Sequence, residues 1–138
     1  MGIENTRHVK LFDGRVFKKP VHVIGAGATG SYLLLQLAKL GVEDIHVWDF
    51  DKIEEHNLAN QLYGPVHVGM PKVEAIQSVI KDQADMDITT HNERVADQRL
   101  SGVVFLLTDT MASRKEIFSN SIRFKPSVEL MVETRMGT

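Results

Sequence analysis

The stretch of residues 21–49 constrains the fold of this chain more than any other. It reads as a short apolar strand, a glycine-rich turn, an amphipathic helix and a second strand. Gly25, Gly27 and Gly30 have the spacing G-x-G-x-x-G, which provides a sharp turn, room for a phosphate to approach bare backbone, and close helix–strand packing. The helix that begins near Thr29 directs unpaired N–H groups and its positive dipole end to the same place. This stretch therefore predicts a nucleotide site.

An acidic residue stands where a nucleotide-binding turn of this kind needs one. Asp49 follows the second predicted strand, Ile45–Trp48, about 20 residues after the glycines. A carboxylate there can accept hydrogen bonds from both ribose hydroxyls of a nucleotide. Asp51 comes two residues later and can either assist Asp49 or cap the following loop.

Predicted strands alternate with predicted helices along the whole chain. We expect strands over residues 21–24, 45–48, 86–90, 103–107 and 128–132, helices over 29–40, 71–82 and 113–123, and a short helix or turn over 93–100. Gly41 is placed to end the first helix, and the long polar connection over residues 50–71 is of a kind that commonly carries function. This alternation predicts an α/β, Rossmann-like doubly wound fold with a mainly parallel sheet and helices on both faces. We expect residues 1–19 to form an N-terminal arm and residues 20–138 one nucleotide-binding domain, truncated at its C-terminal end.

The composition excludes several classes of function. A net charge of −2 argues against a broad surface for nucleic acid or anionic membranes, and no apolar run approaches a membrane span. The chain has no cysteine, which excludes a disulfide, a thiolate metal site or a thiol nucleophile among these residues. The six histidines are scattered, and His22 and His46 are expected in or near the core. We expect a cytoplasmic location.

Polar residues gather at the positions that follow the strands, and the carboxyl ends of parallel strands border the ligand crevice of such folds. Lys72 opens a helix, where a cation is unfavourable beside the dipole, and this local conflict suggests a role with a charged ligand such as a triphosphate. The alternative is that Lys72 is a solvated first-turn residue. Asp109 follows a buried strand and could bind Mg²⁺ through its carboxylate, or could cap the next helix.

Five separated motifs together resemble one known family. They are G-A-G-A-T-G-S, V-W-D-F-D, N-L-A-N-Q, G-M-P-K-V-E-A and L-L-T-D-T, and their order and spacing are similar to those of the ThiF/MoeB/ubiquitin-activating (E1-like) superfamily. A dehydrogenase would share only the first two. The resemblance implies an adenylyltransferase that binds ATP and Mg²⁺ and activates the C-terminal carboxylate of a ubiquitin-like or sulfur-carrier protein. It also implies a homodimer.

The resemblance assigns roles to particular residues of this chain. Lys72 and Asp109 would be the catalytic residues, with Asp109 as the metal ligand. The residues implied at the nucleotide are Gly25, Gly27, Ala28, Thr29, Gly30, Asp49, Asp51, Asn57, Gln61 and Lys72.

One departure from the family pattern keeps two alternatives open. Asn60 stands where the family usually has arginine in N-L-x-R-Q, and a neutral amide lacks the bidentate positive fork of a guanidinium group. A non-catalytic ThiF-like binding domain is therefore one alternative. The other is a dinucleotide (NAD)-binding Rossmann module, which the first two motifs favour and which Lys72 and Asp109 do not.

Overall fold

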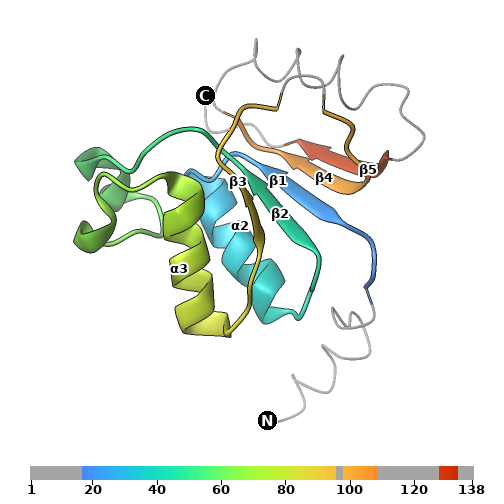
Figure 1. Ribbon diagram of the computed structural model, residues 1–138, viewed down its shortest axis with the longest axis horizontal. Coiled ribbons are helices and arrows are strands. Elements are labelled where there is room, and N and C mark those ends of the chain that lie inside the picture. Colours follow the sequence, from blue (N-terminus) through green and yellow to red (C-terminus); the bar gives the residue numbers. More distant parts are fainter. Residues whose placement is uncertain (1–16, 96–97, 109–127, 134–138) are drawn as a thin grey trace.

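The computed structural model describes residues 17–95, 98–108 and 128–133 (Figure 1). Its centre is a five-stranded parallel sheet with the strand order β3-β2-β1-β4-β5. The strands are β1 (Val21–Ile24), β2 (Ile45–Trp48), β3 (Thr89–His91), β4 (Gly102–Leu106) and β5 (Val128–Glu133), and the α-helices are α2 (Ala28–Lys39) and α3 (Lys72–Ala84). The predicted α/β, Rossmann-like fold is confirmed. The predicted helix over residues 113–123 and most of the predicted N-terminal arm lie outside the described residues.

The strand order places β1 at the point where the direction of chain winding reverses. The chain runs outward from β1 to β2 and β3 on one side, and then returns to add β4 on the other side of β1. Because βαβ crossovers are right-handed, the two steps β1–α2–β2 and β2–α3–β3 place both helices on the same face. Figure 1 shows α2 and α3 packed side by side on that face. A ligand crevice is expected beyond the carboxyl ends of β1, β2 and β4, at this switch point.

Helix α2 ends as its sequence predicts. Gly41 adopts φ of 91°, its N–H donates to the Ala38 carbonyl, and the Val42 N–H donates to the Leu37 carbonyl. This pair of hydrogen bonds is the Schellman motif, in which glycine adopts the left-handed conformation at low cost. The chain is thereby turned back toward β2.

Alternate residues of the strands divide the core between the two faces of the sheet. On the helical face, residues such as Val23 and Val47 pack with Leu34 of α2 and Ile76 of α3 in one continuous apolar cluster. On the other face, a smaller cluster contains Ile24, Trp48, Val95, Leu100, Val104 and Leu106. The loop that carries Val95 and Leu100 therefore covers part of the face that α2 and α3 leave open.

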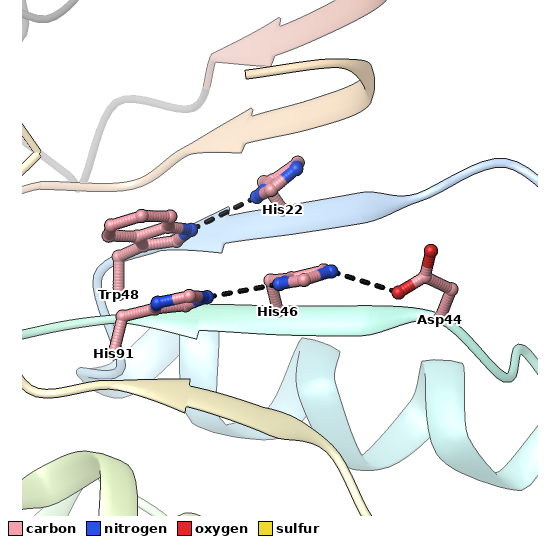
Figure 2. Close-up of polar contacts among 5 residues, drawn as sticks. All are labelled: His22, Asp44, His46, Trp48 and His91. Carbon is pink, nitrogen blue, oxygen red and sulfur yellow. Dashed lines mark hydrogen bonds and ion pairs between the residues drawn. The ribbon is translucent and has the colours of Figure 1, made fainter. Parts of the chain in front are cut away.

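The face opposite α2 and α3 carries an array of three histidines and a tryptophan, which we call the histidine array: His22, His46, His91 and Trp48 (Figure 2). The His46 Nε2–H donates to Asp44 at 2.9 Å, and His46 Nδ1 lies 3.0 Å from Nε2 of His91. Because a carboxylate only accepts hydrogen bonds, this tautomer of His46 leaves Nδ1 to accept from His91. The expectation that His22 and His46 lie in or near the core is confirmed, since His22 is buried and His46 is half-buried.

The rings of the array stack across three neighbouring strands. The Trp48 ring lies 3.8 Å from that of His91 at an interplanar angle of 7°. The Trp48 Nε1–H donates to Nδ1 of His22 at 3.0 Å, which requires His22 to be unprotonated at that nitrogen. The array is thus a hydrogen-bonded and stacked unit of rings in which His22 is unprotonated at Nδ1.

The element boundaries differ from the predicted ones in a few places. The strand predicted over residues 86–90 lies at Thr89–His91, and the connection over residues 50–71 contains two short 3₁₀ helices, Glu55–Ala59 and Pro65–His67. A short helix or turn was expected over residues 93–100. The described residues of that segment form no helix and are irregular, with a bend at Glu93. None of the described helices has the length and apolar character that crossing a membrane requires.

Candidate functional site

A cavity opens at the carboxyl ends of β1, β2 and β4, at the expected switch point. Its polar lining comes from the glycine turn, the residues that follow β2, the first residue of α3, and the segments after β3 and β4. Its apolar walls come from both faces of the sheet. The lining residues are Ile24, Gly25, Gly27, Trp48, Asp49, Phe50, Asp51, Lys72, Glu93, Arg94, Val95, Leu107 and Thr108. The structure therefore brings together five of the residues that the sequence predicted, from three separate elements.

The three glycines of the turn are required for different reasons. A side chain on Gly30 would place its Cβ 1.8 Å from the Gly25 carbonyl oxygen, and one on Gly25 would lie 2.8 Å from the Leu107 oxygen. Both positions are therefore fixed as glycine by the packing of the protein itself. A Cβ on Gly27 would meet the side-chain nitrogen of Gln61 at 3.6 Å, which is an ordinary van der Waals contact. The fold alone does not require glycine there, and the open backbone faces the cavity.

Helix α2 begins at this turn without a capping side chain. Gly27 is the N-cap and supplies no capping side chain, and the first turn contains no acidic residue. Ala28 and Thr29 are the first two helical residues, directly behind Gly27. A helix N-terminus without a carboxylate of its own can stabilise the negative charge of a ligand.

The residue inside the turn, Ala26, is held at both of its backbone groups. Its N–H donates to Oδ2 of Asp49 at 2.8 Å, and its carbonyl accepts from the hydroxyl of Tyr63 at 2.5 Å. Sequence reasoning did not identify Tyr63 as a residue of the site. The signal that could have found it is a lone tyrosine in a polar connection, because a buried phenol needs a hydrogen-bond partner.

Asp49 links the glycine turn to the end of β2. Its second oxygen, Oδ1, accepts from the Asp51 N–H at 2.8 Å, and its own N–H donates to the His91 carbonyl. Burial raises the pKa of the Asp49 carboxyl, opposed by the hydrogen bonds from the Ala26 and Asp51 amides and by the charge of Lys72. Each oxygen of a carboxylate can accept a further hydrogen bond, so the group can still receive hydroxyl donors from a ligand.

Lys72 is a buried cation at the wall of the cavity. Only 7% of its surface is exposed. Its backbone N–H donates to the Asp51 carbonyl, which fixes the start of α3 against the segment that follows β2. In the part of the chain that the structure describes, no carboxylate forms an ion pair with its ammonium group. The alternative of a solvated first-turn lysine does not describe this side chain, since buried charges are normally paired. The site therefore offers a positive charge to an anionic ligand.

Asn57 and Gln61 are not among the residues that line the cavity. Asn57 is 6% exposed, and its side-chain oxygen accepts from the Glu54 N–H at 2.8 Å, which caps the first 3₁₀ helix. Gln61 lies against Gly27, and its Oε1 is buried without a hydrogen-bond partner among the described residues.

The predicted metal ligand, Asp109, lies outside the described residues. Within residues 17–95, 98–108 and 128–133 there is no cluster of three histidine or acidic side chains that could hold a metal ion. Mg²⁺ usually takes one or two carboxylates together with phosphate oxygens and water, so a site of this class does not need such a cluster.

The apolar walls of the cavity were not predicted from the sequence. Trp48 and Phe50 flank Asp49 in the chain, and Val95 and Leu107 reach the cavity from other segments. Flat apolar walls beside a few convergent polar groups are typical of sites for ring-containing small molecules.

A model of the ThiF family matches residues 10–129. The chain belongs to the ThiF family. The family that the sequence motifs indicated is therefore confirmed. Among curated ThiF-family relatives, the chain is 34% identical over 79 residues to the ubiquitin-like modifier-activating enzyme 5 of Caenorhabditis elegans, covering 56% of this chain and 19% of that protein. It is 35% identical over 102 residues to the NEDD8-activating enzyme E1 catalytic subunit of Arabidopsis thaliana, covering 69% of this chain and 22% of that protein. The chain thus spans about a fifth of the length of these relatives.

Two solved structures illustrate the shared fold. E. coli MccB crystallised with ATP is similar with a TM-score of 0.63 and 20% identity, over 72% of this chain and 32% of that one. E. coli tRNA N6-threonylcarbamoyladenosine dehydratase, TcdA, in complex with AMP has a TM-score of 0.72 and 19% identity, over 91% of this chain and 53% of that one. At this level of identity the likeness concerns the fold.

Proposed function

We propose that this chain is the nucleotide-binding part of an ATP-dependent adenylating enzyme, which activates the C-terminal carboxylate of a ubiquitin-like or sulfur-carrier protein. The observation that carries the proposal is the buried lysine, Lys72, in the lining of the same cavity as the glycine turn and Asp49. Membership of the ThiF family supports it, as do relatives that are named activating enzymes.

The charge at the cavity favours a triphosphate over a dinucleotide. A dinucleotide pyrophosphate is satisfied by backbone donors at a helix N-terminus and needs no lysine. In adenylation, an oxygen of the substrate carboxylate attacks the α-phosphorus, the bond to the leaving pyrophosphate breaks, and an acyl-adenylate forms. The negative charge that builds on the leaving pyrophosphate is what a positioned lysine can offset. No protein nucleophile is needed, so alignment and charge neutralisation account for the role of the protein.

Each part of ATP has a place in this proposal. Asp49 accepts hydrogen bonds from the ribose hydroxyls, with Asp51 beside it. Gly25, Gly27, Ala28, Thr29 and Gly30 surround the phosphates, and Asn57, Gln61 and Lys72 complete the phosphate side. Asp109 is proposed as the ligand of Mg²⁺, which supplies charge neutralisation between phosphate oxygens when it is bound. From the family resemblance we extend the proposal to a homodimer and to a cytoplasmic location.

Asn60 supports a second candidate function. Its exposed amide stands where the family usually has an arginine, and it supplies no positive charge to the phosphates. A binding domain that holds the nucleotide without turnover is therefore the alternative. ATP–pyrophosphate exchange with candidate carrier proteins separates the two, because only the adenylating enzyme returns labelled pyrophosphate to ATP.

The experiment that tests the nucleotide site is a titration of the 138-residue chain with ATP and Mg²⁺ by calorimetry. We expect Lys72→Ala to weaken ATP binding by about ten- to a hundred-fold, because a hydrogen bond to a charged group contributes about 1.5–3 kcal/mol. Lys81→Ala is the matched control, since Lys81 lies on the same helix, is exposed and pairs with Asp85 at 3.4 Å. Adenosine affinity should be equal in all three proteins, and urea unfolding checks that each is folded.

Two results would contradict the proposal. Equal affinity of wild type and Lys72→Ala for ATP would mean that the triphosphate lies elsewhere. Binding of NAD without binding of ATP would favour a dinucleotide module.

A further inference from the structure

Two successive residues of the connection after β2 are hydrogen-bonded to the region where α2 begins. The Leu62 N–H donates to Ser31 Oγ at 3.1 Å, and the Tyr63 hydroxyl donates to the Ala26 carbonyl at 2.5 Å. The last of these attachments acts on the glycine turn itself, and it joins residues that are far apart in the sequence.

Tyr63 is suited to hold that carbonyl permanently. Its side chain is 7% exposed, and its ring packs in the apolar cluster under the sheet. Burial raises the pKa of the Tyr63 phenol, and the negative charge of Asp49 raises it further. The hydroxyl therefore stays protonated and remains a donor to Ala26 throughout the physiological pH range.

The hydrogen bond to the Ala26 carbonyl also determines where the next amide points. The described chain has no cis peptide bond, and in a trans peptide the C=O of one residue and the N–H of the next point in opposite directions. With the Ala26 carbonyl directed to Tyr63, the Gly27 N–H points away from Tyr63. Gly27 lines the cavity, and its N–H receives no acceptor from the described residues.

Asp49 holds the other end of the same residue, because its carboxylate accepts the Ala26 N–H. The peptide planes on both sides of Ala26 are therefore fixed, one by a carboxylate and one by a phenol. A donor that is already aimed at its ligand loses less entropy on binding than one that must first be ordered.

We infer that Tyr63 is a positioning residue for the nucleotide phosphate, which acts by fixing the Ala26–Gly27 peptide so that the Gly27 N–H faces the phosphate. This inference rests on the proposed function, in which a phosphate binds at the glycine turn. In this inference Tyr63 does not touch the nucleotide itself, and it sets the orientation of Gly27, which does.

The test compares Tyr63→Phe with two matched controls in the 138-residue chain. Tyr32→Phe removes the hydroxyl of the only other tyrosine, which lies on α2 and is 48% exposed. Ser31→Ala removes the neighbouring attachment at Leu62 and leaves the Ala26 carbonyl paired. We expect Tyr63→Phe to weaken ATP and AMP binding by about three- to ten-fold, the range of one hydrogen bond, and to leave adenosine affinity unchanged. Both controls should bind all three ligands as wild type does.

A second readout follows the Gly27 amide directly in protein labelled with ¹⁵N-glycine. In wild type and in both controls, ATP should shift the Gly27 amide proton strongly downfield, and in Tyr63→Phe this shift should shrink. Without ligand, the ¹⁵N order parameter of the Gly27 amide should be lower in Tyr63→Phe than in Ser31→Ala, because the Ala26–Gly27 peptide plane has lost the hydrogen bond that fixes it. This arm remains informative if Tyr63→Phe is less stable, because Ser31→Ala also loses a buried hydrogen bond.

The outcomes separate the inference from the function on which it rests. If wild type binds no ATP, the proposed function fails, and the order parameter of the Gly27 amide without ligand alone decides whether Tyr63 fixes the turn. If all four proteins bind ATP equally, with equal Gly27 shifts, the role of Tyr63 is refuted while the nucleotide site stands. If adenosine binding falls as much as ATP binding, Tyr63 supports the structure only, and the inference is overturned.

Discussion

Acidification should destabilise this protein through one buried histidine, His22 of the histidine array. Its side chain is 7% exposed, and its Nδ1 accepts the Trp48 Nε1–H. Burial lowers the pKa of His22 to about 4, the positive charges that His46 and His91 can carry lower it further, and Asp44 opposes these effects. A proton on Nδ1 would also deprive Trp48 of its acceptor.

The size of the effect follows from the difference between folded and unfolded pKa values. A histidine in the unfolded chain titrates at about 6.5, so between pH 6.5 and pH 4 the unfolded state holds a proton that the native state does not. Stability from this group is therefore fully present above pH 6.5 and is lost as the pH falls toward 4. At pH 5 the loss is roughly 2 kcal/mol, a considerable fraction of the stability of a small domain.

The assay is urea unfolding at pH 7.5 and pH 5.0 for wild type and His22→Asn. Asparagine offers an oxygen acceptor to Trp48 and does not titrate. The free energy of unfolding of His22→Asn should therefore decrease from pH 7.5 to pH 5.0 by roughly 2 kcal/mol less than that of wild type does. His56→Asn, at an exposed position of the first 3₁₀ helix, should keep the wild-type difference.

The reasoning would be refuted by a His22→Asn variant that loses as much stability on acidification as wild type. An NMR titration that places the pKa of His22 near 6.5 in the folded protein would refute it independently. Burial also lowers the pKa of His91, so part of the acid sensitivity should remain in His22→Asn.

Two further predictions concern the glycine turn and Asp49. Gly30→Ala should lower the free energy of unfolding in urea by about 3 kcal/mol or more, because its Cβ would meet the Gly25 oxygen at 1.8 Å. Gly27→Ala should change the free energy of unfolding by less than about 1 kcal/mol and should weaken ATP binding about ten-fold or more. The reverse order of the two stabilities would contradict this assignment. Asp49→Asn should lower the free energy of unfolding by about 1–3 kcal/mol, because an amide can accept only one of the two N–H groups from Ala26 and Asp51 and directs its own NH₂ at the other. An Asp49→Asn variant with the same free energy of unfolding as wild type would show that these hydrogen bonds contribute little to stability.

Local patterns were enough to predict the elements around the site. The glycine spacing, the apolar strand before it and Gly41 after the helix each act within a few residues, and the structure has β1, α2 and the Schellman turn where they predict them. A local conflict singled out Lys72, since a cation opens a helix against the dipole, but its burial was not predicted. The position of the crevice followed from strand alternation alone.

Features that depend on contacts distant in the sequence were not predicted. The hydrogen bond from Tyr63 to Ala26 spans 37 residues, and no periodicity marks it. The histidine array requires the register of three strands, which sets His46 of β2 opposite His22 of β1 and Trp48 opposite His91 of β3. A contact between near neighbours was missed as well. The side-chain oxygen of Asn57 caps the first 3₁₀ helix, a role that the motif around Asn57 did not indicate.

The central place of β1 has a consequence for how the protein is made. β1 pairs with β2 on one edge and with β4 on the other, and β4 begins at Gly102, 54 residues (102 − 48) after β2 ends at Trp48. At a synthesis rate of roughly 5–20 residues per second, the second edge of β1 waits roughly 3–11 s for its native neighbour after β2 has emerged. During that interval the nascent chain exposes an apolar strand edge at the middle of its future sheet, and this is the stage at which a ribosome-bound chaperone has most to protect.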